Sequence, residues 1–210
     1  MNTRFFILLL STKRKTIKIS TLLLLPITAL LMLKIFYIET KAVVAQKLLA
    51  YSWQESKRSK KPVKPWKWAD INPVGSLRVP RLGIHQIILN GHNGEALAFG
   101  PGQIKTGGSI ALAGHRDSHF EFLKDLKNGD RVFLENVNGK ETPYTIEKLY
   151  IQDLREVSDL TLKENILTLV TCYPFDKPTA GGPLRYIVEA RPLGQPPHPN
   201  SELTTIAYAL

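Results

Sequence analysis

The chain is predicted to contain one all-β domain, a barrel or a sandwich, and three observations predict it. From about residue 71 onward, short runs rich in aliphatic and β-branched residues recur, Gly or Pro stands in nearly every gap, and only one modest helical segment interrupts them. Short strands with such turns are typical of all-β barrels and sandwiches rather than of α/β folds. The roughly 140 residues from 71 to the end are enough for one domain with a single core.

Seven or eight strands are expected in this domain. The helical candidate is FEFLKDLK, residues 120–127. Residues 193–210 are a C-terminal tail; its start, in the Pro-rich stretch PLGQPPHPN from Pro192, is expected to be extended, and SELTTIAYAL after it is too short to interpret. The seven strands that the pattern defines are 76–80, 85–89, 109–113, 131–136, 142–151, 165–171 and 184–190.

An apolar stretch near the N-terminus predicts a membrane anchor. Residues 19–38 supply about the 20 mostly apolar residues that a helix needs to cross a bilayer. Pro26 and Lys34 interrupt this stretch, but a membrane helix tolerates proline, and a lysine near its end can reach the interface. A cleaved signal peptide ending at the small residues 43–45 is the alternative. We expect an uncleaved transmembrane helix.

Basic segments flank the predicted anchor on both sides. The leader, residues 1–18, is expected in the cytoplasm, and the linker, residues 39–70, outside it. Because both flanks are basic, the orientation rests mainly on the short leader and the long domain that follows. The domain is therefore expected on the periplasmic or extracytoplasmic side of the cell membrane, as part of a single-pass protein.

The net charge of +10 is located outside the predicted domain. Residues 1–69 hold 14 Lys and Arg against two acidic residues, whereas residues 70–210 hold 14 against 16. A nearly neutral domain has no electrostatic surface for a phosphate backbone, so nucleic acid is excluded as a partner. The basic stretch 57–68 is either a solvated linker or a segment that contacts anionic lipid headgroups.

Cys172 is the only cysteine in 210 residues. It cannot form an intramolecular disulfide or a multi-cysteine metal site, which leaves a buried inert thiol, an intermolecular link or a nucleophile. It follows a predicted core strand and precedes Tyr173, Pro174 and Phe175, which end that strand. A strand end can hold a reactive group rigidly and still leave it accessible.

Two further residues supply what thiol catalysis requires. His115 follows the strand 109–113 and Gly114, and an imidazole can protonate a departing amine. Arg185 lies 13 residues beyond Cys172 on the next strand, where a hairpin would bring the two together. A guanidinium there can stabilise an oxyanion. Such a hairpin permits Cys172 and Arg185 to face the same cleft, and His115 occupies a comparable place at the end of its own strand.

Neighbouring residues are alternatives or supports for these three. His119 competes with His115, and Arg116 competes with Arg185. Asp117 is either an imidazole-orienting carboxylate or a surface residue of a turn, and Thr171 contributes a hydroxyl or a backbone contact although its side chain points to the face opposite Cys172. The remaining histidines, His85, His92 and His198, are expected to be ordinary polar residues. No spacing predicts a metal site, and no cofactor is expected.

Three sequence blocks resemble the signature blocks of sortases, which are membrane-anchored cysteine transpeptidases. They are AGHRDSHF at 113–120, TLVTCYPF at 168–175 and PLRYIVEAR at 183–191, and the middle block matches the family's Thr-Leu-x-Thr-Cys pattern. The resemblance covers residues 71–191. The combination of the motifs GHRDSHF and TCYPF is most similar to the class GN sortases of Gram-negative bacteria.

This resemblance implies a closed eight-stranded β-barrel with short helices over residues 71–192. It implies that Cys172 is the nucleophile, that His115 is the general acid and base, and that Arg185 stabilises the oxyanion or orients the substrate. The implied substrate is a protein with an LPxTG-like C-terminal sorting signal, cleaved between Thr and Gly. The acyl group would pass from a thioester on Cys172 to an amine acceptor. The N-terminal anchor would hold the enzyme in the lipid membrane.

Two other families of cysteine enzymes fit the order of these residues less well, and a non-enzymatic function is also possible for such a domain. An L,D-transpeptidase also places His before Cys, but its arginine directly follows the cysteine, where this chain has Tyr173. Papain-like peptidases place Cys before His. A membrane-tethered β-domain that binds an envelope partner without catalysis, such as an inactive sortase relative, is the non-enzymatic alternative.

Overall fold

The computed structural model describes residues 3–106, 109–156, 160–177, 179, 181–194 and 203–206. A long helix, α1 (Thr3–Ser59), begins the chain, and the chain divides into two compact units, residues 1–45 and 46–210. Within the part of the chain that the structure describes, unit 1 consists of α1 alone. The transmembrane span predicted over 19–38 lies in this unit. Among the residues that the structure describes, no helix is long and apolar enough to cross a membrane.

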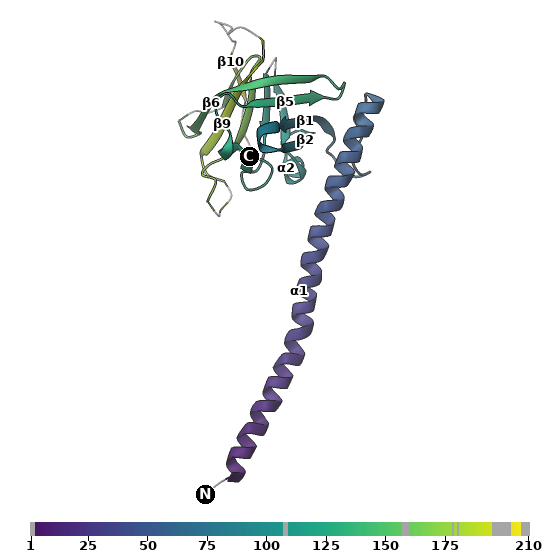
Figure 1. Ribbon diagram of the computed structural model, residues 1–210, viewed down its shortest axis with the longest axis vertical. Helices are drawn as coiled ribbons and strands as arrows, with labels where there is room; N and C mark the ends of the chain where they lie inside the picture. The colour runs from purple at the N-terminus through teal and green to yellow at the C-terminus, as the bar shows by residue number, and fades with distance from the viewer. Residues whose placement is uncertain are drawn as a thin grey trace. The chain divides into compact units, whose positions relative to one another are not determined.

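The second unit is built around a closed eight-stranded barrel (Figure 1). Its strands are β1 (Pro73–Val79), β2 (Ile84–Asn90), β3 (Gly102–Thr106), β4 (Ser109–Ala113), β5 (Arg131–Asn136), β6 (Glu141–Asp153), β8 (Leu167–Cys172) and β9 (Leu184–Pro192). Around the barrel they follow the order β1-β2-β3-β4-β8-β9-β6-β5. The prediction of an all-β domain is confirmed, and the closed eight-stranded barrel is the form that the sortase resemblance implied; β7 (Leu160–Lys163) and β10 (Leu203–Ile206) lie outside it.

Three strands were not predicted from the sequence. β3 has the sequence GQIKT, which lacks the alternation of a half-buried strand. β7 (Leu160–Lys163) and β10 (Leu203–Ile206) are four residues long and pair with each other as a separate two-stranded sheet. β10 lies in the C-terminal tail, in the part for which the sequence predicts no structure; residues 195–202, with His198, and 207–210 fall outside the described residues.

Short helical turns connect the strands. They are η1 (Pro80–Leu82), α2 (Gly94–Phe99) and η2 (Glu121–Asp125). The helix predicted over 120–127 is the 3-10 helix η2, whose inner face buries Phe122 and Leu123. The Asn93 side chain caps α2 by accepting the Ala96 N–H. Two residues of α2, Gly94 and Leu97, line the cavity of the candidate active site.

The central strands β8 and β9 are buried on both faces. Leu169 and Val188, which are register partners, pack inside the barrel, whereas the next pair, Val170 and Ile187, packs outside it. Leu162 of β7 covers this outer pair. Strands buried on both faces are continuously apolar, which explains the run that precedes Cys172.

The part of α1 within the second unit, from residue 46 to Ser59, packs on the barrel domain. Leu49 and Trp53 are almost fully buried, and Leu49 joins a cluster with Ile71 and Leu89. Ser56 Oγ accepts the Val63 N–H at 3.0 Å and ties the segment after the helix to it. Residues 46–59 of the predicted linker are therefore a helical part of the domain.

Candidate active site

The ends of β4 and β8 lie side by side and present His115 and Cys172 at the same edge. The two strands are parallel, with Ala113 opposite Val170, and the Gly114 N–H donates to the Val170 carbonyl at 3.2 Å. His115 and Cys172 each lie two residues beyond that rung. Parallel neighbours end at the same edge of a sheet, so the pairing brings together two side chains that lie 57 residues apart in the sequence.

A hydrogen bond from Thr171 fastens these two ends to each other. Thr171 Oγ1 donates to the Gly114 carbonyl at 2.7 Å, and its side chain is almost fully buried. Because side chains alternate along a strand, Thr171 points away from the face that carries Cys172. Thr171 therefore does not line the site, but it fixes the residue that precedes His115.

Gly114 allows the chain to turn at this point. A Cβ added to Gly114 would lie 2.7 Å from Cγ of the fully buried Phe120, far inside van der Waals contact. The Phe120 N–H donates to the His115 carbonyl at 2.9 Å and closes the turn that follows. The position of the His115 backbone is therefore set from both sides.

β9 places Arg185 directly opposite Cys172. The two residues are register partners in the antiparallel β8–β9 pair, and the Tyr173 N–H donates to the Leu184 carbonyl at 3.0 Å. Arg185 is only 5% exposed. Its Nη1 donates to the carbonyls of Gly182 at 2.7 Å and Leu184 at 3.1 Å, whereas Nε has no partner in the described part of the chain.

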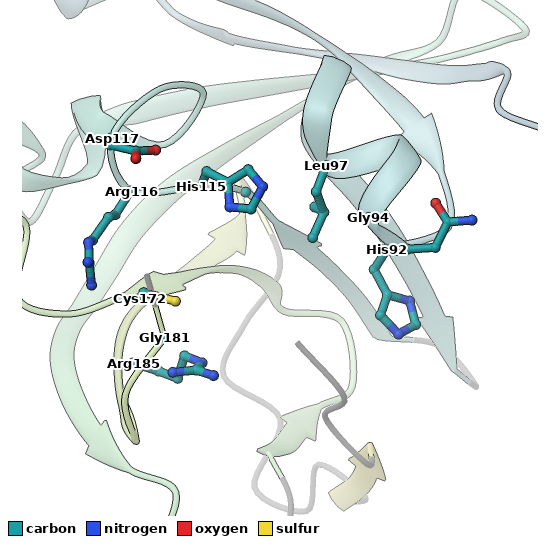
Figure 2. A pocket seen from close by; sticks show the side chains of 11 residues that line it. His92, Gly94, Leu97, His115, Arg116, Asp117, Cys172, Gly181 and Arg185 are labelled. Atoms are coloured by element: carbon teal, nitrogen blue, oxygen red, sulfur yellow. The ribbon is translucent and has the colours of Figure 1, made fainter. Parts of the chain in front are cut away.

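These residues border one cavity of about 310 Å³. In Figure 2 the Cys172 sulfur points into the space between the His115 ring and the Arg185 guanidinium, and Leu97 of α2 borders the same space. Cys172 is partly exposed and His115 is exposed, so a ligand can reach both. The residues that line the cavity are His92, Asn93, Gly94, Leu97, Gly114, His115, Arg116, Asp117, Cys172, Gly181 and Arg185.

The predicted supporting residues occupy different places. Asp117 lines the cavity, but its carboxylate points away from Cys172 in Figure 2 and its side chain is exposed. His119 does not line the cavity and lies beside the Ala98 backbone of α2. Burial lowers the pKa of His119; the backbone hydrogen bond at Ala98 opposes this shift, and the charge of His115 adds to it.

Arg116 and Arg185 donate hydrogen bonds to different parts of the chain. Its side chain is 6% exposed, and its Nη2 donates to the carbonyls of Lys177 and Thr179 in the loop between β8 and β9. Arg185 instead bonds within its own hairpin, opposite Cys172. Both arginines line the cavity, but only Arg185 is the register partner of the thiol.

His92 lines the cavity, although the sequence predicts an ordinary polar residue at this position. It follows β2 in the segment NGHNG and lies across the cavity from Cys172 in Figure 2. A histidine among turn residues carries no signal for a cavity, because the parallel pairing of β2 with β3 that brings this segment into place is not visible in the sequence. His85, by contrast, is exposed on β2.

The cavity is rich in cationic groups. Arg116 and Arg185 are buried, and Asp117 is its one carboxylate among the described lining residues. Within the ranges that the structure describes, no cluster of three or more His, Cys, Asp or Glu side chains is arranged to hold a metal ion. A thiol, an imidazole and a guanidinium around one space can attack a carbonyl, protonate a leaving group and stabilise an oxyanion.

Comparison with known proteins identifies the family. A sortase domain model matches residues 77–193, which is more than half of the chain. The chain belongs to the sortase family. Sortases as a family are cysteine transpeptidases that act on proteins with sorting signals and on amine acceptors.

A curated sortase relative and two solved sortases are similar to the chain. Sortase D of Bacillus subtilis (strain 168) is 34% identical over 122 residues, which are 54% of this chain and 61% of that protein. The chain thus spans about three fifths of the length of this relative.

The solved structures show the likeness of the fold. The Sortase D5 transpeptidase of Clostridium perfringens matches with a TM-score of 0.53 at 19% identity, covering 72% of this chain and 99% of that one. The lid mutant of sortase A from Corynebacterium diphtheriae matches with a TM-score of 0.51 at 18% identity, covering 74% and 96%. The barrel described above is therefore the sortase fold.

Proposed function

We propose that this sortase cleaves an LPxTG-like sorting signal through a thioester on Cys172 and transfers the acyl group to an amine. The observation that carries the proposal is the convergence of Cys172, His115 and Arg185 on one cavity from three strands that the barrel holds rigidly. Each of the three supplies a different requirement of acyl transfer.

In the first half-reaction, the Cys172 thiolate attacks the carbonyl carbon of the Thr-Gly bond. The oxyanion that forms lies beside Arg185, whose buried guanidinium stabilises its charge. When the C–N bond breaks, the His115 imidazolium donates its proton to the departing amine. The products are an acyl thioester on Cys172 and the released C-terminal fragment.

In the second half-reaction, the amine acceptor attacks the thioester carbonyl. His115, now neutral, accepts the proton from the attacking nitrogen, and the Cys172 thiolate leaves. Water can replace the amine, because the cavity is open to solvent at His115. The new amide and the free enzyme are the products of transpeptidation, and a free acid is the product of hydrolysis.

The test is turnover of a reporter peptide by the full chain and by Cys172→Ala. We expect the variant to lose activity by a factor on the order of a million, the scale of a lost nucleophile in a catalytic triad. The fold should persist, because Cys172 is only partly buried at the end of its strand. Retained cleavage by a folded Cys172→Ala variant would remove Cys172 from the mechanism.

We also propose that the chain acts at the cell envelope with its barrel outside the cytoplasm. The support is the apolar sequence of residues 19–38, where large side chains such as Leu24, Leu33 and Phe36 are more than half exposed. Exposed apolar side chains in such number need an apolar partner. Fractionation of cells that express the full chain tests this location, and recovery in the soluble fraction would contradict it.

The subclass is the finest part of the proposal. The blocks AGHRDSHF and TLVTCYPF support class GN, whereas the curated relative at 34% identity is a sortase D. Competition between reporter peptides that differ only in the variable residues of the sorting motif would define the specificity on which such a subclass rests.

A non-catalytic binding domain is the second candidate function. The open cavity with two buried arginines would suit an anionic partner without any chemistry. Wild-type protein that binds a sorting-signal peptide but never cleaves it, with or without an amine, would favour this candidate.

A further inference from the structure

Arg116 is a buried cation beside the proposed acid and base. Its guanidinium is 6% exposed, and no ion pair with a carboxylate is found for it among the described residues. Its Nη1 is also enclosed and has no acceptor in this part of the chain. A buried charge with incomplete hydrogen bonding costs stability, so Arg116 is not explained by stability alone.

The acceptors of Arg116 lie in the loop that joins Cys172 to Arg185. Its Nη2 donates to the Lys177 carbonyl at 2.8 Å and to the Thr179 carbonyl. Arg116 follows β4, whereas the loop connects β8 to β9. A single side chain therefore connects the segment that carries His115 to the loop that connects the other two site residues.

The loop needs such a connection because its own backbone is permissive. Gly181 and Gly182 both have positive φ, 80° and 106°, which glycine adopts at little steric cost and loses much entropy to fix. Gly181 forms part of the cavity wall, and the Gly182 carbonyl accepts from Arg185. Movement of the loop would therefore change the cavity wall at Gly181.

We propose that Arg116 is a positioning residue that holds the β8–β9 loop closed against the end of β4 and thereby sets the affinity for the peptide substrate. The inference rests on the proposed function, because it assigns the cavity to a peptide. Arg116 touches no reacting atom in this scheme. It acts through the loop, so its loss should weaken substrate binding more than it slows the chemistry.

The test compares full-chain Arg116→Gln with Arg131→Gln, a matched control on the exposed part of β5. Hydrogen exchange over residues 174–184 should accelerate about tenfold in Arg116→Gln, as expected for the loss of one charged hydrogen-bonding group. KM for the reporter peptide should rise about tenfold. The turnover number and the rate at which iodoacetamide alkylates Cys172 should change less than about threefold. The control should match wild type in every measurement.

Three outcomes would overturn the proposal. Unchanged loop exchange in Arg116→Gln would show that Arg116 does not hold the loop. A large fall in the turnover number at constant KM would show that it acts on the chemistry. An alkylation rate that falls together with turnover would show that it acts on the thiol itself.

Two further arrangements keep the result interpretable. Arg116→Lys keeps a charged donor without the planar fork, and it should give intermediate exchange and KM; a Lys variant as impaired as Gln would contradict a role through hydrogen bonds. If wild type cleaves no peptide, the proposed function fails, whereas the exchange experiment still decides whether Arg116 holds the loop.

Discussion

The outer face of the β8–β9 pair has polar side chains at both ends, and the two ends are built differently. At one end Glu189 is 6% exposed and accepts from Lys163 Nζ at 2.8 and 2.9 Å and from the Tyr150 hydroxyl at 3.0 Å. At the other end Arg185 has an Nε without a partner in the described chain, and Cys172 is a free, partly exposed thiol.

This difference indicates that the Glu189 end of the strand pair contributes to stability, whereas the Arg185 end contributes to activity. Arg185 and Glu189 stand four residues apart on β9, so their side chains share a face of the sheet. The buried charge of Glu189 is satisfied by a cation and a hydroxyl, as is usual for buried polar groups. The incompletely satisfied end borders the cavity. Changes at Arg185 should therefore alter activity, and changes at Glu189 should alter stability.

The largest expected effect is at the cavity end. Arg185→Lys keeps the charge but loses the planar fork that bonds Gly182 and Leu184. We expect kcat/KM for the reporter peptide to fall about a hundredfold, the scale of a lost oxyanion donor. Steady-state kinetics beside Arg131→Lys as a control would measure it. Wild-type rates in Arg185→Lys would contradict this role for Arg185 and would assign the oxyanion-stabilising role to Arg116.

At the other end, Glu189→Ala should lower the free energy of unfolding by about 2 kcal/mol. The variant leaves Lys163, which is 35% exposed, and Tyr150 without their acceptor. Denaturant unfolding measures the change, with the exposed Glu156→Ala as the control. Turnover should stay within about twofold of wild type. If Glu189→Ala lost activity without losing stability, the assignment of stability to the Glu189 end and activity to the Arg185 end would be wrong.

A smaller effect is expected for the residue that connects the cavity end to β4. Thr171→Val removes the 2.7 Å hydrogen bond to the Gly114 carbonyl, which costs about 1 kcal/mol of unfolding free energy. Activity should fall severalfold as well, because Gly114 positions His115. Thr171→Ser keeps the hydroxyl and should restore both properties. Equal behaviour of the Val and Ser variants would show that the hydroxyl has no positioning role.

The smallest effect concerns alkaline pH at the satisfied end. Burial, and then the charge and the hydrogen bond of Glu189, raise the pKa of Tyr150 well above its usual value of 10. A pKa raised in the folded state gives stability that is complete below pH 10 and is lost as the pH rises further. Tyr150→Phe should therefore be less stable than wild type at pH 8, and this difference should shrink toward about pH 11. A difference that stays constant with pH would contradict the assignment.

The sequence predicts where the strands that carry the site lie, but it does not predict which of these strands pair with each other. The runs SIALA and TLVTC are apolar because their strands are buried, so both β4 and β8 could be expected from the pattern. The residues alone left a barrel or a sandwich open. The parallel pairing that puts His115 beside Cys172 joins segments far apart in the chain, and no local pattern encodes it.

The supporting contacts were harder to predict than the three central residues. Arg185 could be placed opposite Cys172 because a hairpin connects them. Arg116 bonds to backbone carbonyls, which every residue has, so its partners leave no signature in the sequence. The sequence predicts that Thr171 faces away from Cys172, but the carbonyl that its hydroxyl reaches belongs to Gly114, which directly follows β4 far away in the chain.

Mass spectrometry of the full chain, mixed with an LPxTG-containing peptide and then digested, tests the central claim most directly. The account predicts an added mass on the fragment that carries Cys172, equal to the acyl part of the peptide up to Thr. Addition of an amine should remove this mass and produce the corresponding amide. Peptide cleavage without any adduct on Cys172, or an adduct that persists in Cys172→Ala, would contradict the account.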